Sequence, residues 1–117
     1  MSDFGSELGT DYCVVYLTAA SLEQAQLLAD TLVQEQLAAC VNRVGPVHST
    51  YLWQGELCQD QEYLLIVKTR QMRLSALTTR VQALHSYEVP EVIALPIVGG
   101  LDRYLKWIGS QTLKQDP

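Results

Sequence analysis

The stretch VHSTYLWQGELCQDQEYLLIVKT, residues 47–69, decides the fold. Its first arm alternates from residue to residue up to Gln54-Gly55, a dipeptide whose glycine accepts the positive φ of a tight hairpin turn. A return strand begins near Leu57 and ends at Thr69. Both arms are longer than the usual five or six residues of a strand, so the sequence predicts one long hairpin.

A hairpin of this length needs a covering surface. A two-stranded ribbon that projects into water is only marginally stable, and large aromatic side chains near its tip are costly to expose. Tyr51 and Trp53 lie near that tip, and aromatic residues are enriched in protein interfaces. We therefore expect Tyr51 and Trp53 to anchor contacts with another subunit.

A strand and a helix precede the hairpin. Residues 12–18 are β-branched and aromatic, which predicts a buried strand. The hydroxyl of Ser21 is placed to cap a helix that runs to about Gln36, with Gln24 reaching back to complete a capping box. The apolar stripe of this helix has helical spacing: Ala25, Leu28, Ala29 and Leu32.

A second strand leads into the hairpin. Residues 39–43 form its first part, and Gly45-Pro46 interrupts it, because proline cannot donate to a sheet ladder. The chain must therefore bulge there or lie at a sheet edge.

Two helices and a strand follow the hairpin. A helix from about Arg73 ends before Pro90 and carries the stripe Leu74, Leu77, Val81 and Leu84. Residues 92–97 form a fourth strand, with Pro96 at an edge or a strand end. Gly99-Gly100 then leads into a short last helix with Leu101, Tyr104, Leu105 and Ile108 on its apolar side.

The order βαββαβ with a terminal helix predicts an α+β fold, the ferredoxin-like split βαβ sandwich. Two helices cover one face of a four-stranded antiparallel sheet in this arrangement, and the other face stays bare. An apolar bare face in a soluble chain is buried by association, most simply under closed cyclic symmetry. We expect a single domain over residues 12–113, preceded by a flexible leader, residues 1–11.

Composition excludes several classes of protein. A chain of 117 residues with 48% hydrophobic residues can bury a core without disulfides or metal. A net charge of -5 argues against nucleic-acid binding, and no apolar run is long enough to span a membrane. Three cysteines, Cys13, Cys40 and Cys58, fit no disulfide framework or zinc knuckle, so we expect each thiol to serve as a small hydrophobic side chain on a strand, in a cytoplasmic protein.

Five segments resemble successive motifs of the CutA family of divalent-cation tolerance proteins. They are EQLAACVN (35–42), YLWQGE (51–56), LLIVKTR (64–70), HSYEVPEVIALPI (85–97) and YLKWI (104–108). The fourth matches the H-x-Y-x-x-P-E run of that family. The resemblance implies a ferredoxin-like subunit in a tight homotrimer, with the long hairpin extending the sheet of a neighbour.

The resemblance also implies a metal ion, copper or another divalent cation, although no cofactor is required for the fold. Members of the family credited with copper binding are similar to this chain but carry a cysteine where Leu17 stands and a second histidine where Leu84 stands. His85 and Glu91 remain as metal ligands, which predicts weak binding. Alternatively, the His85 ring caps the carbonyls of the preceding helix, and His48 is a plain surface or interface residue.

The family pattern further implies a cleft between subunits. Lys68, Tyr87 and Glu88 are the residues we expect to line it, either as ligand contacts or as structural ion pairs across the trimer.

The sequence contains no nucleophile with a base and orienting group, and no glycine-rich phosphate loop, so we expect no enzymatic activity. Two other functions stay open. One is a trimeric sensor like the nitrogen-regulatory PII proteins, which bind small anions between subunits. The other is a structural or anchoring trimer.

Overall fold

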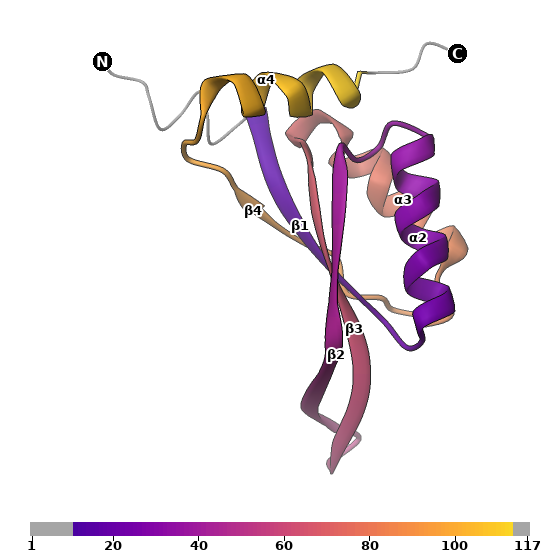
Figure 1. The fold of residues 1–117 in the computed structure, drawn as a ribbon. Coiled ribbons are helices and arrows are strands. Elements are labelled where there is room, and N and C mark those ends of the chain that lie inside the picture. The colour runs from indigo at the N-terminus through magenta and orange to yellow at the C-terminus, as the bar shows by residue number, and fades with distance from the viewer. Residues whose placement is uncertain (1–10, 114–117) are drawn as a thin grey trace.

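The computed structural model describes residues 11–113 and confirms the expected element order (Figure 1). The elements are β1 (Tyr12–Ala19), α2 (Leu22–Gln34), β2 (Cys40–Trp53), β3 (Glu56–Arg70), the 3-10 turn η1 (Gln71–Arg73), α3 (Leu74–Leu84), β4 (Ile93–Pro96) and α4 (Asp102–Gln111). The predicted leader, residues 1–11, lies outside the described residues except for Asp11. Within residues 11–113, no helix is long and apolar enough to cross a membrane.

The four strands of the described chain form one sheet in the order β2-β3-β1-β4, with every neighbouring pair antiparallel. β1 lies inside the sheet and pairs with β3 along its whole length, from Tyr12 opposite Arg70 to Ala19 opposite Tyr63. α2 and α3 lie side by side next to the sheet (Figure 1). This is the ferredoxin-like arrangement predicted from the sequence.

The hairpin of β2 and β3 follows the prediction closely. Its strands pair as far as Trp53 opposite Glu56, and the two turn residues, Gln54 and Gly55, have φ values of 51° and 83°. Two positive φ values in a two-residue loop match the twist of the flanking strands. The register shifts between Val44 and Val47, so the Gly45-Pro46 segment both bulges and lies on an edge strand.

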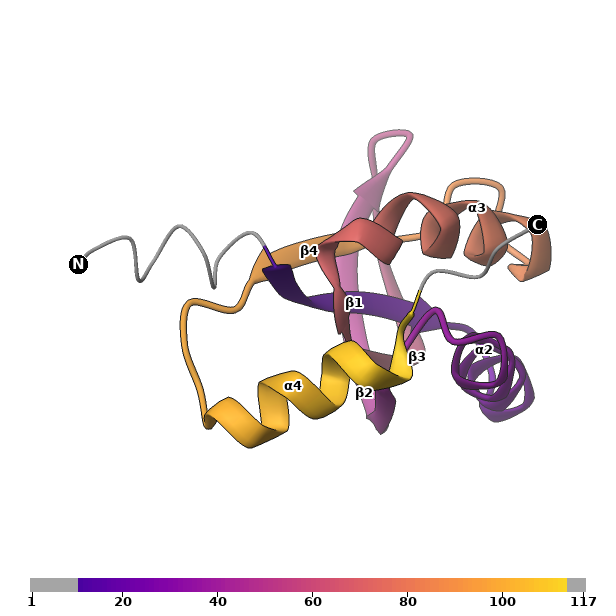
Figure 2. The ribbon, with the colours of Figure 1, turned by 90° about the horizontal axis from the view of Figure 1, so that it is seen from above.

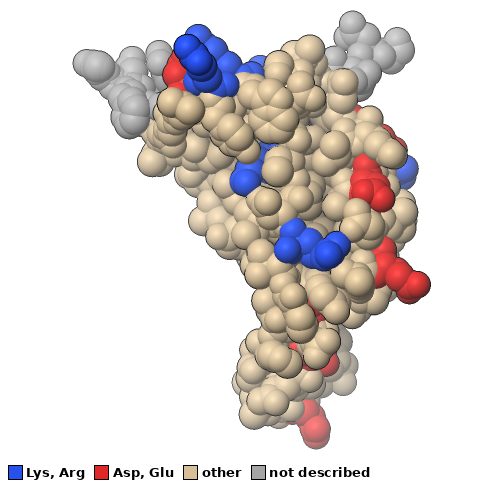
Figure 3. Space-filling view, in the orientation of Figure 1, with Lys and Arg blue, Asp and Glu red and all other residues tan. Residues whose placement is uncertain are grey.

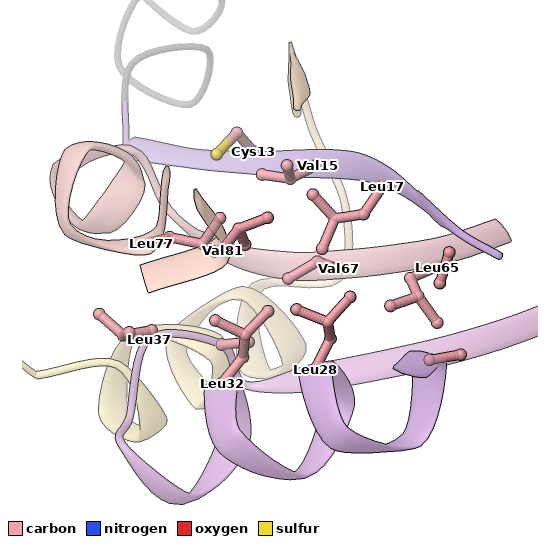
Figure 4. Packing of buried hydrophobic residues seen from close by; sticks show 13 residues of the cluster. Cys13, Val15, Leu17, Leu28, Leu32, Leu37, Leu65, Val67, Leu77 and Val81 are labelled. Carbon is pink, nitrogen blue, oxygen red and sulfur yellow. The ribbon is translucent and has the colours of Figure 1, made fainter. Parts of the chain in front are cut away.

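The core lies between the sheet and the two helices α2 and α3 (Figure 4). Alternate residues of β1 point into it because successive side chains of a strand face opposite sides. Fully buried members include Cys13, Val15, Leu17, Leu28, Leu32, Leu65, Val67, Leu77 and Val81. Burial of each such leucine or valine contributes roughly 1.5–3 kcal/mol relative to exposure, so this layer fixes how the helices sit on the sheet.

The start of α2 differs from the predicted capping box. The Ser21 hydroxyl accepts a hydrogen bond from the Gln24 amide at 3.1 Å, as expected. The side chain of Gln24 does not return to Ser21, however. It donates to the Leu84 carbonyl at 3.3 Å and accepts from the Ser86 amide at 2.7 Å. Gln24 therefore ties the start of α2 to the segment after α3, where unpaired backbone groups at a helix end need partners.

α4 covers only one end of the opposite sheet face, seen from above in Figure 2. Leu105 and Ile108 are buried there against Tyr12 and Ile97, and Tyr12 points away from the Cys13 side of β1. The rest of this face stays partly open in the single chain. Its exposed apolar side chains come from three strands: Tyr16, Val44, Ile93 and Leu95.

Candidate functional site

A hollow of about 410 Å³ lies beside the hairpin. β2 and β3 form one wall, and the segment between α3 and β4 forms the other. The lining residues are Tyr51, Trp53, Asp60, Glu62, Tyr87, Glu88 and Val89. The lower part of the hairpin carries acidic but no basic side chains on the face shown in Figure 3, and residues 44–67 contain no Lys or Arg.

Strand alternation brings the hairpin residues of the hollow together. Asp60 and Glu62 are two positions apart on β3, so their side chains share one face of the strand. Tyr51 and Trp53 are related in the same way on β2. One wall of the hollow therefore combines carboxylates with aromatic rings.

Each carboxylate of the hollow wall is paired with a tyrosine. The Tyr87 hydroxyl donates to Glu62 Oε2 at 2.8 Å, and the Tyr51 hydroxyl donates to Asp60 Oδ2. The hydrogen bond to Asp60 raises the pKa of Tyr51 to about 12. Burial, together with the hydrogen bond to Glu62, raises the pKa of Tyr87 as well. Both phenols therefore stay protonated at neutral pH and act as hydrogen-bond donors.

His85 lies just behind Tyr87, and both of its ring nitrogens are used within the chain. Its Nε2 lies 2.7 Å from the Thr18 carbonyl oxygen, and its Nδ1 accepts a hydrogen bond from the Tyr87 amide at 3.0 Å. A carbonyl oxygen can only accept, so this arrangement assigns the proton to Nε2. The ring is buried and meets β1 rather than the last carbonyls of α3, which corrects the capping role expected as the alternative. His85 contributes to the end of α3 only through its backbone amide, which donates to the Val81 carbonyl.

Glu91 interacts electrostatically with Glu62 of the hollow. Burial raises the pKa of Glu91 above its usual value, and the charge of Glu62 adds to the increase. Glu62 itself is only 8% exposed. Tyr87 contacts the His85 ring at a centroid distance of 4.7 Å and pairs with Glu62 through its hydroxyl. His85 is thus in contact with Tyr87 and Tyr87 with Glu62, whereas Glu62 acts on Glu91 through its charge alone.

Lys68 lies elsewhere in the single chain. Its Nζ donates to Asn42 Oδ1 at 2.5 Å, and it is six positions along β3 from Glu62, or about 20 Å at the rise of an extended strand. Tyr87 and Glu88 share the hollow, with Glu88 exposed at its rim. A cleft that joins Lys68 to these two residues across a subunit boundary stays a prediction.

The hollow is suited to cations by its charge. Carboxylate oxygens are the ligands that hard divalent ions prefer. Among residues 11–113, however, no three His, Cys, Asp or Glu side chains converge closely enough to hold a metal ion. Leu17 is buried in the core and Leu84 packs against it, so neither position offers a donor.

Asp60 and Glu62 are the residues that sequence reasoning missed. The signal was present in the alternation Cys58, Asp60, Glu62, which places polar side chains on the same strand face as the apolar Leu64 and Ile66. Their role as partners of Tyr51 and Tyr87 depends on the packing of distant segments.

Comparison with known proteins points to one family over most of the chain. The profile of the family described as CutA1 divalent ion tolerance protein matches residues 13–111. Protein CutA, chloroplastic, from Arabidopsis thaliana is 54% identical over 99 residues, which cover 85% of this chain and 54% of the plant protein. The divalent-cation tolerance protein CutA of Thermus thermophilus is 50% identical over 99 residues, covering 85% of this chain and 96% of that protein. The chain thus spans about half the length of the plant relative.

Solved structures agree with the fold. The CutA1 crystal structure from Oryza sativa has a TM-score of 0.88 at 46% identity and covers 92% of this chain and 99% of that one. The structure of the divalent cation tolerance protein from Thermus thermophilus has a TM-score of 0.85 at 50% identity, covering 86% of this chain and 98% of that one. The match over nearly all of the described residues and these identities lead to one conclusion: the chain belongs to the CutA1 divalent ion tolerance family.

Proposed function

We propose that this protein serves divalent-cation tolerance as a non-enzymatic homotrimer that binds copper or another divalent cation weakly beside the acidic hollow. The observation that carries the proposal is the acidic lining of the hollow, where Asp60 and Glu62 share one face of β3 and the charge of Glu62 acts on Glu91, in a chain of the CutA1 family. Two carboxylates held close together repel each other, and a divalent cation relieves that repulsion. The same raised pKa means that cation binding competes with a proton at Glu91.

His85 is the proposed second ligand for copper, because imidazole suits copper better than carboxylate does. Its Nδ1 already accepts the Tyr87 amide, so metal binding must displace that hydrogen bond. The displaced amide costs binding energy, which supports a weak affinity. A trimer would add ligands from neighbouring copies and could bring Lys68 of one subunit toward Tyr87 and Glu88 of another.

Assembly and location are part of the same proposal. The open apolar sheet face and the exposed hairpin tip support a homotrimer, and the three free cysteines support a reducing, cytoplasmic environment. A sensor that binds small anions between subunits, one of the two alternative functions, gains no support from a hollow lined by Asp60, Glu62 and Glu88.

The test is calorimetric titration of Cu(II) into the wild type and three variants, His85→Ala, Glu91→Gln and His48→Ala. His48 is the matched control, because it is exposed on β2 and pairs with Gln61, whose side chain faces away from that of Glu62. We expect the affinity to fall by about tenfold or more in the first two variants and to stay unchanged in the third.

Equal copper affinity in the wild type and in both site variants would place the metal elsewhere, with the three thiols as the next candidates. A parallel titration with a panel of nucleotides distinguishes the anion-sensor alternative, since tight nucleotide binding without copper binding contradicts the proposal.

A further inference from the structure

Glu62 has a free carboxylate oxygen at the wall of the acidic hollow. Only 8% of the surface of Glu62 is exposed, and its Oε2 accepts the hydrogen bond from the Tyr87 hydroxyl at 2.8 Å. Its Oε1 has no hydrogen-bond donor among residues 11–113. A largely buried carboxylate is unfavourable unless its oxygens are paired. Glu62 therefore needs a donor that the described chain does not supply.

The free oxygen of Glu62 remains accessible. Among the side chains of residues 11–113 that are not exposed, the only nitrogen or oxygen that is both enclosed and unpaired is the Nε of Arg73. Glu62 Oε1 is unpaired, so it is not enclosed. Because Glu62 lines the hollow of about 410 Å³, a ligand in the hollow has a route to this oxygen.

The acidic hollow has no positive charge of its own. Asp60, Glu62 and Glu88 line it, without any Lys or Arg. The two salt bridges within residues 11–113 involve other carboxylates, those of Glu35 and Asp102. Neighbouring carboxylates repel one another, so a bound cation lowers the free energy of the hollow. A metal ion is not the best match for the hollow itself, since no three metal-ligating side chains of the described residues converge.

The apolar part of the lining favours an organic cation. It consists of Tyr51, Trp53, Tyr87 and Val89. Aromatic rings attract ammonium groups through their faces and also give apolar surface on which methylene groups pack. We propose that the acidic hollow binds a short linear diamine, with one ammonium group donating to Glu62 Oε1 and the second pairing with Asp60.

The spacing of these two carboxylates fits a diamine. Asp60 and Glu62 lie two positions apart on β3, or about 7 Å at the rise of an extended strand, which the chain of a four-carbon diamine spans. Both ammonium groups stay protonated at neutral pH, as the lysine side chain does. The diamine site does not depend on the proposed copper site, because His85 and Glu91 do not line the hollow.

The first test is NMR titration of the full-length protein with putrescine, a four-carbon diamine. Putrescine should shift the amides of residues 58–62 and 87–89. Butylamine lacks the second ammonium group, so it should bind about twofold to fivefold more weakly. Tetramethylammonium carries a charge but no N–H donor, and butanol carries no charge, so both should bind more weakly still. A tetramethylammonium affinity equal to that of putrescine contradicts the hydrogen bond to Glu62.

Variants of the two carboxylates test their separate roles. Glu62→Gln keeps an oxygen for the Tyr87 hydroxyl but removes the charge, so the putrescine affinity should fall by about tenfold or more. Asp60→Asn leaves Glu62 in place, so the test survives if Glu62→Gln fails to fold, and it should lower the putrescine affinity to that of butylamine. Glu23→Gln, which removes an exposed carboxylate from α2, is the matched control. Unchanged putrescine affinity in Glu62→Gln or Asp60→Asn overturns the proposal.

A lysine of a neighbouring copy carries the same alkylammonium group as a free diamine, and Lys68→Gln separates the two sources. We expect putrescine to bind both the wild type and Lys68→Gln. Binding that appears only in Lys68→Gln assigns the hollow to the lysine of a neighbouring copy and overturns the free diamine as its ligand. Glu91→Gln, which should weaken copper binding, should still bind putrescine, so failure of one proposal is distinguishable from failure of the other.

Discussion

At the scale of single residues, the segment after α3 is held by buried polar groups that satisfy one another. His85 joins the Thr18 carbonyl to the Tyr87 amide, and the Tyr87 hydroxyl pairs with Glu62. Each hydrogen bond contributes little by itself, but losing one partner leaves the other group buried and unsatisfied. This network positions Tyr87 over the acidic hollow, so a residue with a structural role also shapes the candidate site.

Replacing His85 with Ala should lower the free energy of unfolding by about 2–4 kcal/mol, because it leaves the Thr18 carbonyl and the Tyr87 amide unpaired and opens a small cavity. The measurement is denaturant unfolding at matched protein concentration. His48→Ala is the control, since surface changes usually stay within about 0.5 kcal/mol. Equal losses in the two variants would show that the His85 hydrogen bonds do not stabilise the fold.

The raised pKa of Glu91 predicts that the stability of the fold depends on pH. Its pKa is raised in the folded state, so the folded chain holds this proton more tightly than the unfolded chain does. The stabilisation is complete below the unfolded pKa of about 4.3 and is lost as pH rises through the folded pKa. Glu91→Gln should therefore melt at a higher temperature than the wild type at pH 7, with the difference closing toward pH 4.

The matched control for this measurement is Glu56→Gln, which removes an exposed carboxylate at the hairpin turn. We expect a difference between this control and the wild type that varies little with pH. A Glu91→Gln difference that stays constant between pH 4 and pH 7 would contradict the assigned cause.

At the scale of elements, the tip of the hairpin of β2 and β3 is not covered by any other part of the described chain. Its tip exposes apolar side chains on both faces, with Leu52 70% and Trp53 63% exposed. Leu57 lies directly opposite Leu52 and is exposed as well. Large apolar side chains at such a tip are costly to expose, so we expect a partner surface to cover it.

Trp53→Ala should weaken subunit assembly by about 2–4 kcal/mol if Trp53 anchors a neighbouring subunit, as aromatic interface residues typically do. The assembly midpoint can be followed by sedimentation over a dilution series. Gln59→Ala, at an exposed polar position on the opposite arm, provides the control. An unchanged midpoint for Trp53→Ala would show that this side chain faces solvent in the assembled protein.

At the scale of the whole molecule, the second face of the sheet remains to be covered. α2 and α3 bury one face, whereas α4 covers only one end of the other. The open remainder carries Tyr16 at 36% and Ile93 at 50% exposure, next to each other across β1 and β4. Closed cyclic assembly buries such a face without leaving a free copy of it that could extend into a fibre.

Light scattering at micromolar concentration should therefore give a mass of about three times the 13.1 kDa of the chain. Replacing Ile93 with Lys places a charge on the open face and should shift the mass toward the monomer, whereas Ser75→Lys on the exposed side of α3 should not. A mass of 13.1 kDa for the unmodified protein would contradict assembly.

The sequence by itself determined the element order, the hairpin and its turn, the interruption of β2 at Gly45-Pro46 and the apolar stripes of the helices. These features follow from local spacing, because alternation and helical periodicity record which side of each element is buried. It also brought Tyr51, Trp53, Tyr87, Glu88 and Glu91 into consideration through side-chain type and family motifs.

Only the tertiary structure decided which of these residues meet. Thr18 and His85 are 67 positions apart, and Glu62 and Tyr87 are 25 apart, so neither contact leaves a local trace in the sequence. For the same reason, the sequence does not reveal that the Nε of Arg73 lacks a partner among the described residues. It also does not reveal that Lys68 lies away from the acidic hollow within one chain. Long-range contacts depend on how complete elements pack, and that packing is settled by the shared core rather than by any single segment.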